Sequence, residues 1–300
     1  MSSAPLTNQK ASKGFRIFAT VAIVVTGVII LTIFGVVSKK HQSAENLSGK
    51  NDENDSVEYF VVNATLGPGL KLEAMPWSAR LPRDRADEFD VSSDGPVLVR
   101  FNGKILDFAS GATLTPEATV RSFAFVRGAI AIVTNAKHLA YLSEEGVRDV
   151  GLAPMSAARI CPSDDGQELL LIRDDEPYGL ASVDSGGQVR PLSGSPSHIE
   201  TVAGTSARHI FSIGNELYLQ EGDGPPALLL RLPQKEARII GLALHGDDIY
   251  FATREGIYAI KGSLAVPLVL GFGGPLRMTK DGLVILNAKN GRLYRLLTNA

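Results

Sequence analysis

The apolar residues of this chain fall into two patterns, one long run near the start and many short runs after it. Residues 17–37 contain no charged residue, whereas beyond Val57 the apolar residues come in runs of about five to seven that end at Gly, Asp, Asn or Pro. A run of about 20 residues, at 1.5 Å each, matches the roughly 30 Å of a bilayer's hydrocarbon core. The short runs are rich in Val, Ile, Leu, Phe and Tyr and lack a helical period, which is typical of an all-β domain.

Two strands joined by a polar turn recur through the second part of the chain. Most copies open on a turn glycine, and the copies begin at Gly95, Gly128, Gly166, Arg208, Gly246 and Gly282. The first three are 33 and 38 residues apart, and the last two are 36 residues apart. A period near 40 residues is typical of four-stranded blades arranged radially. Six hairpins therefore predict an all-β fold, a six-bladed β-propeller over residues 57–300.

The two ends of the predicted propeller complement each other. The chain stops after Arg292–Leu297 with three strands of its last blade, whereas Val57–Asn63 is a strand that has no blade of its own. We expect this early strand to pair with the last blade, because an unpaired sheet edge invites aggregation.

The long apolar run differs from a cleaved signal peptide. The hydrophobic region of a signal peptide has about 7–15 residues and precedes a small-x-small cleavage site, whereas this run is longer and Val36–Lys40 offers no such site. We therefore expect a signal anchor, a transmembrane helix over residues 15–38. A head over 1–14 would precede it, and a polar, flexible tether over 39–56 would follow it.

The orientation of the anchor rests on its flanking charges. Three basic residues precede the run and three follow it, namely Lys10, Lys13, Arg16, Lys39, Lys40 and Lys50. The tie is broken by the positive amino terminus and by the short polar head, which would seldom cross a membrane. We expect a single-pass protein of a bacterial inner membrane, with a cytoplasmic head, the bilayer as partner of residues 15–38 and the propeller in the periplasm.

One stretch of the domain resembles a repeat of the TolB-type, WD40-like six-bladed propellers. It consists of Ser163–Gly166, Glu168–Asp174, Ser182–Asp184, Gly186–Gly187 and Val189–Leu192. This copy has an inserted acid where that motif has Ser-Pro. The closing hairpins at Gly256–Ile260 and Gly291–Leu296 are more similar to quinoprotein-like or NHL-type propellers. The resemblance implies blades around a central tunnel, a shape that serves both as binding scaffold and as enzyme.

The chain lacks the common signatures of catalysis and of transition-metal binding. It has no Gly-x-Ser-x-Gly elbow, its five histidines show no His-x-x-x-His spacing, and Cys161 is its only cysteine. A metal-dependent lactonase or other hydrolase with its site in the tunnel is the alternative, with Glu200, Asp90 and Glu88 as candidate oxygen ligands. Most paired acids fall at predicted turns, where they are common for local reasons. We predict no catalytic residue, no metal and no cofactor.

Cationic residues recur at one place in the repeat. Arg121, Arg159 and Arg238 stand seven or eight residues before the hairpin turn of their blades, His198 occupies the related place in the fourth blade, and Arg277 lies nearby in the sixth. Inner strands should begin there, close to a tunnel mouth. We expect a partial ring of cations that binds an anionic ligand through guanidinium groups. Alternatively, each arginine pairs with acids of its own blade.

The charge of the domain narrows its partners. Six of the 30 basic and four of the 32 acidic residues precede Val57, which leaves 24 basic and 28 acidic residues in the domain. Nucleic acid binding requires a basic surface, so the mildly acidic domain is predicted to have no nucleic acid partner. With a membrane anchor, a propeller and no catalytic signature, the sequence predicts a non-catalytic scaffold in the cell envelope. Its protein partners would lie in or near the membrane. A sensor is disfavoured because the short head leaves little room for an output module.

Overall fold

The computed structural model describes residues 64–77, 80–92, 95–115, 119–126, 129–135, 138–143, 146–152, 157–163, 166–173, 179–184, 187–233 and 237–298. The predicted head, transmembrane helix and tether, and the strand Val57–Asn63, lie outside these residues. Among the described residues, none belongs to a helix with the length and apolar character needed to cross a membrane.

In the described part of the chain, 24 strands form six sheets, which are the six predicted blades. Blade 1 consists of β3 (Glu88–Val91), β4 (Val97–Phe101) and β5 (Lys104–Asp107). Blade 2 consists of β6 (Val120–Val126), β7 (Ala129–Thr134), β8 (His138–Ser143) and β9 (Gly146–Leu152). Blade 3 consists of β10 (Ala157–Pro162), β11 (Leu169–Arg173), β12 (Leu180–Val183) and β13 (Val189–Pro191).

The other three blades belong to the second part of the chain. Blade 4 consists of β14 (Thr201–Gly204), β15 (Arg208–Ile213), β16 (Glu216–Glu221) and β17 (Ala227–Arg231). Blade 5 consists of β18 (Gly241–His245), β19 (Asp248–Ala252), β20 (Gly256–Lys261), β21 (Leu264–Leu270) and the early strand β1 (Thr65–Leu66). Blade 6 consists of β22 (Leu276–Thr279), β23 (Gly282–Leu286), β24 (Leu293–Thr298) and the early strand β2 (Leu70–Ala74).

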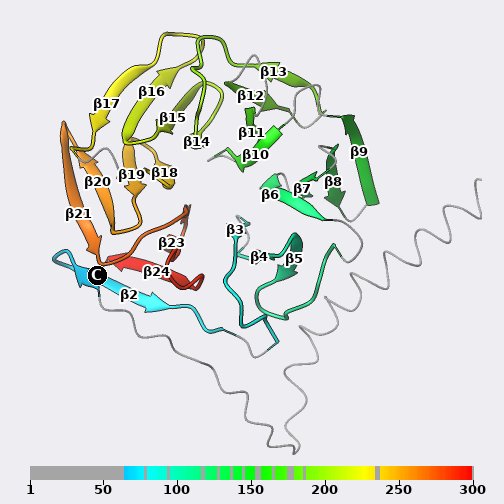
Figure 1. Cartoon of the computed structure of the whole chain (residues 1–300), viewed down its shortest axis with the longest axis horizontal. Coiled ribbons are helices and arrows are strands. Elements are labelled where there is room, and N and C mark those ends of the chain that lie inside the picture. Colours follow the sequence, from blue (N-terminus) through cyan, green and yellow to red (C-terminus); the bar gives the residue numbers. More distant parts are fainter. Residues whose placement is uncertain are drawn as a thin grey trace, which may run out of the picture. The chain divides into compact units, whose positions relative to one another are not determined.

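The blades follow one another around a common centre (Figure 1). Strands that are consecutive within a blade pair antiparallel, and the first strands β3, β6, β10, β14, β18 and β22 contact one another in turn. These six inner strands therefore line the tunnel. The six predicted hairpins are the second and third strands of the blades, so the prediction of a six-bladed propeller is confirmed.

Each blade buries both of its faces. In β11, Leu169 and Leu171 pack in a cluster with blade 2, whereas Leu170 and Ile172 pack in a cluster with blade 4. Successive side chains of a strand point to opposite faces, so a strand that is buried on both faces is a continuous apolar run. Six such clusters separate the six blades, including one between blade 6 and blade 1. The apolar core is thus a closed ring.

The seam between the two ends of the domain is made by β2. Its register with β24 runs from Leu70 opposite Thr298 to Ala74 opposite Tyr294. β24 thus lies between β2 and β23. The sequence predicted that Val57–Asn63 pairs with the last blade. In the structure, the strand that pairs with β24 is Leu70–Ala74.

An aromatic and cationic cluster reinforces this seam. Trp77, which follows β2, is buried edge-on against Phe101 and Phe108, with ring centroids 5.8 and 5.5 Å apart. The guanidinium carbon of Arg292, from blade 6, lies 4.0 Å from the centroid of the Trp77 ring. Arg292 also donates to the carbonyl oxygens of Asp84 at 3.1 Å and Arg83 at 2.9 Å. The segment between β2 and β3 is thereby fixed to blade 6.

Candidate functional site

A cavity occupies the tunnel mouth at which the inner strands end. Its volume is about 740 Å³, and we call it the strand-end cavity. Every blade contributes to its wall, and the lining includes Ser92, Val126, Ser163, Thr205, His245 and Lys280, which lie at or just after the ends of the six inner strands. The cavity is therefore a shared product of ring closure, and no single blade contains it.

Cationic side chains outnumber acids in the described lining of the strand-end cavity. The cations are Arg208, Arg277, Lys280 and Arg295, and the acids are Asp90 and Asp281. Arg208 pairs with Asp247, with Nη1 3.0 Å from Oδ1. Arg295 differs, because its Nε atom is buried and has no hydrogen-bond partner among the described residues. Lys280 and Arg295 are thus the cations of this mouth for which the described residues supply no carboxylate.

A buried ion pair links three blades beside the cavity. Asp90 in β3 has no exposed surface, and its Oδ1 accepts a hydrogen bond from Nε of Arg277 in β22 at 2.8 Å. Its Oδ2 accepts one from the backbone N–H of Phe125 in β6 at 2.7 Å. Burial raises the pKa of Asp90, and the charge of Arg277 opposes that rise. Burial lowers the pKa of Arg277, but the charge and hydrogen bond of Asp90, together with the neighbouring Cys161 and Glu88, raise it above its ordinary value, so the guanidinium stays charged.

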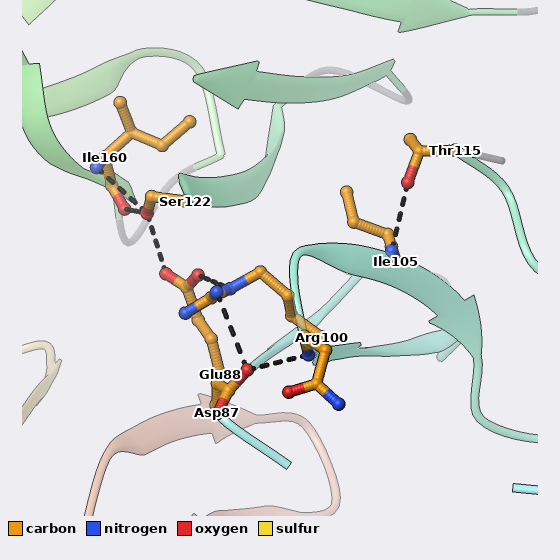
Figure 2. Close-up of polar contacts among 8 residues, drawn as sticks. Asp87, Glu88, Arg100, Ile105, Thr115, Ser122 and Ile160 are labelled. Carbon is orange, nitrogen blue, oxygen red and sulfur yellow. Dashed lines mark hydrogen bonds and ion pairs between the residues drawn. The ribbon is translucent and has the colours of Figure 1, made fainter. Parts of the chain in front are cut away.

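A second carboxylate, which is largely but not fully buried, connects blades 1, 2 and 3 (Figure 2). Glu88 Oε2 accepts a hydrogen bond from Nε of Arg100 at 3.0 Å, and its Oε1 accepts one from the hydroxyl of Ser122 at 2.8 Å. The same Ser122 oxygen accepts the backbone N–H of Ile160 at 3.2 Å. Burial raises the pKa of Glu88, and Arg100 opposes the rise. Both oxygens of this carboxylate thus hold neighbouring strands in place.

The five cations predicted to form a ring lie at or before the beginnings of inner strands, but the structure groups them differently. Nη1 of Arg159 donates to the carbonyl oxygen of Glu200 at 3.1 Å, and Nη2 of Arg238 lies 3.5 Å from the carboxylate of the same residue. Arg277 instead pairs with Asp90. In each of these three pairs the partner comes from a neighbouring blade and not from the blade of the cation.

The remaining two of these cations have separate positions. Arg121 is the second residue of β6 and directly precedes Ser122. His198 is exposed, in the connection between β13 and β14, and has a left-handed backbone with φ of 64°. Only Arg277 of the five belongs to the wall of the strand-end cavity. The cavity therefore lies at the mouth opposite the one that the sequence pattern indicated.

The acids considered as lactonase ligands do not form a metal site. Asp90 pairs with Arg277, Glu88 with Arg100, and Glu200 with Arg238. Among the described residues, no group of three or more His, Cys, Asp and Glu side chains is placed to hold a metal ion. Each of these acids is therefore paired with an arginine, which belongs to the same blade for Glu88 and to a neighbouring blade for Asp90 and Glu200.

Sequence reasoning missed a buried histidine in blade 4. His209 Nδ1 lies 3.2 Å from the carbonyl oxygen of Thr205, and its Nε2 lies 3.2 Å from Oε1 of Gln220. The amide nitrogen of Gln220 donates to the carbonyl oxygens of Ser193 at 2.6 Å and Gly224 at 2.9 Å. Burial lowers the pKa of His209, and the acceptor Gln220 opposes the change. The signal in the sequence was His209 directly opposite Gln220 in the β15–β16 hairpin.

The comparisons with known proteins concern the fold. Streptogramin B lyase superposes with a TM-score of 0.50 at 16% identity, over 76% of this chain and 97% of that chain. A proposed glucose dehydrogenase from Thermus thermophilus gives 0.52 at 15% identity, over 76% and 100%. A proposed gluconolactonase gives 0.52 at 11% identity, over 78% and 94%. No protein-family model matches the sequence, and no curated protein matches it. At these identities the likeness establishes the six-bladed propeller fold alone.

Proposed function

We propose that this protein is a non-catalytic interaction scaffold of the cell envelope. Residues 15–38 anchor it in a bacterial inner membrane, and the propeller binds a protein partner in the periplasm at the strand-end cavity. The observation that carries the proposal is that the acids of the inner strand β3 are already hydrogen-bonded within the protein. Both oxygens of Asp90 and both oxygens of Glu88 are bonded to groups of the protein itself.

This arrangement differs from what a hydrolytic site requires. A general acid or base must face a position where a substrate atom can sit, within hydrogen-bond reach. Asp90 and Glu88 have the raised pKa that such a role favours, but their oxygens are hydrogen-bonded to arginine, serine or backbone groups of their own or a neighbouring blade. Perturbed pKa values also arise in structural ion-pair networks, and here burial of the two carboxyl groups raises their pKa values while the arginine charges and hydrogen bonds oppose the rise.

The strand-end cavity suits an anionic group of a partner. Lys280 and Arg295 contribute two positive charges to its wall, and a guanidinium can bind a carboxylate through two parallel hydrogen bonds. A cavity of about 740 Å³ admits a few side chains of a protein loop or terminus. We infer that the partner presents an acidic segment to this mouth.

Crosslinking in native membranes tests this function. A photoreactive residue in place of Thr205, on the cavity wall, should capture a discrete protein partner. Replacing Lys280 and Arg295 together with Gln should reduce that capture, whereas replacing Arg190 with Gln, an exposed cation on the outer strand of blade 3, should leave it unchanged. Equal capture by all three chains, or hydrolysis of a lactone panel by the purified chain, would overturn the proposal.

A further inference from the structure

Exposed aliphatic side chains gather on the outer strand of blade 5. Among the described residues, the large apolar side chains with the greatest exposure are Leu228, Leu264, Val266 and Leu270, and the last three belong to β21. Leu264 is 68% exposed and Val266 is 40% exposed. They are two residues apart, so they project from the same face of the strand. Lys261, whose side chain is also exposed, is the cross-strand partner of Leu264, and its Nζ lies 3.2 Å from Oδ1 of the half-exposed Asp248.

The same strand receives the beginning of the described chain. β1 pairs antiparallel with the far end of β21, with Thr65 opposite Leu270 and Leu66 opposite Val269, and the N–H of Gly67 donates to the carbonyl of Leu268 at 2.9 Å. The chain then leaves β21 and enters β2 at Leu70. The domain is therefore joined to the 63 preceding residues at the strand that carries the exposed aliphatic side chains.

This part of β21 is poorly suited to accept a further strand. No described strand pairs with the outer edge of Leu264–Pro267. Pro267 has no N–H to offer, and a bulge interrupts the register between Pro267 and Val269. Proline and bulges are features that prevent strand addition at sheet edges. What the edge offers to a partner is therefore its side chains.

The chemistry of these side chains favours lipid over protein. Contacts that dominate protein interfaces are enriched in Trp, Tyr and Arg, whereas Leu and Val are under-represented. Aliphatic side chains beside a lysine are typical of surfaces that enter the boundary between headgroups and acyl chains. Lys261 and Leu264 flank the tip of the β20–β21 hairpin, so the aliphatic contact and the cation lie together.

We propose that the β21 rim, which we define as Lys261, Leu264 and Val266, rests on the lipid surface of the membrane that holds the anchor. The proposal rests on the anchor in the proposed function. Two aliphatic side chains bind lipid weakly when the protein is free. The polar tether predicted over residues 39–56 would span only about 25 Å on average, which would make lipid contact an intramolecular event at millimolar effective concentration.

A pair of probes in the full chain tests the rim. The only native cysteine, Cys161, is buried, so Leu264→Cys can be labelled selectively with an environment-sensitive dye. Leu228→Cys is the matched control, because Leu228 is an exposed leucine on the outer strand of blade 4. Both chains are reconstituted into vesicles of phosphatidylcholine with a minor fraction of phosphatidylglycerol. We expect nitroxide-labelled lipid to quench the probe at 264 and aqueous iodide to quench the probe at 228.

The outcomes separate the rim from the anchor. If alkaline carbonate strips the chain from the vesicles, the anchor is absent and the rim proposal falls with it. If the chain stays in the vesicles but iodide quenches both probes equally, the rim proposal alone is overturned. Shielding of position 264 only in native membranes would assign the rim to a protein and also overturn it. Val266→Cys provides a second probe, and unchanged Trp77 emission verifies the fold of each variant.

Discussion

Replacing Arg277 with Met should strongly destabilise the propeller. The substitution removes the guanidinium that neutralises Asp90 but keeps an apolar chain of similar length. Asp90 would then be a fully buried carboxylate, and none of the described residues that contact it would carry a positive charge. Removing one partner of a buried ion pair costs about 3–5 kcal/mol. For a domain of this size, at about 2–4 °C per kcal/mol, Tm should fall by about 6–20 °C.

The loss should depend on pH in a defined direction. Burial already raises the pKa of Asp90, and removing the opposing charge of Arg277 should raise it further. A carboxyl group whose pKa is higher in the folded than in the unfolded chain favours folding when it is protonated. The difference in stability between Arg277→Met and the unaltered chain should therefore shrink as the pH falls through the folded-state pKa of Asp90.

Thermal unfolding of the full chain in detergent measures this effect. Trp77 is the only tryptophan and is buried at the seam between blades 6 and 1, so its emission reports on ring integrity. Adding Asp90→Asn to Arg277→Met removes the unpaired charge and should restore most of the loss. The control Arg231→Met alters an exposed arginine that pairs with Glu216 and should change little. A small effect of Arg277→Met, or no recovery in the double variant, would refute the reasoning.

Three further predictions, one of them with a control substitution, have defined outcomes. Arg292→Lys keeps the charge but loses the fork that bonds two carbonyls and covers Trp77, so it should lower stability by about 2 kcal/mol or more and shift Trp77 emission. Gly274→Ala would place a Cβ against the Leu286 carbonyl oxygen and should cost about 3 kcal/mol or more, whereas Gly262→Ala, with no atom within 4 Å of its Cβ, should cost only about 1–2 kcal/mol for its left-handed backbone; urea unfolding compares the two. Because burial lowers the pKa of His209, its contribution to stability is complete above the unfolded pKa of about 6.5 and is lost as the pH falls from there through the folded pKa. The His209→Gln variant should therefore lose less stability than the unaltered chain between pH 7.5 and pH 5. Equal shifts of the urea midpoint in the two chains would contradict this.

Local pattern predicted the blades because each hairpin is encoded within about 15 adjacent residues. The closing strand was harder to find. β2 reads Leu70-Lys71-Leu72-Glu73-Ala74, in which apolar and charged residues alternate. Leu70, Leu72 and Ala74 pack against the core between blades 5 and 6, while Lys71 and Glu73 are exposed and pair with each other. This alternation is typical of an outer strand with one solvent-exposed face. It is a weaker sequence signal for a strand than the apolar run of Val57–Asn63.

The candidate site was predictable only in part. The recurrence of arginine before the hairpin turns correctly indicated the beginnings of inner strands, but it did not reveal the partners of these side chains. Arg277 and Asp90 are 187 residues apart in sequence, and they meet because the ring brings blade 6 beside blade 1. The strand-end cavity likewise has a wall from all six blades, so no local motif records it.

The sequence by itself determined the number of blades and the burial of their faces, because hairpin pairing and alternation are properties of neighbouring residues. The tertiary structure decided which strand closes the ring, which charges meet across the blades and at which mouth the cavity lies. Those features depend on long-range pairing, in which many short apolar strands are nearly equivalent partners, and only ring closure selects among them.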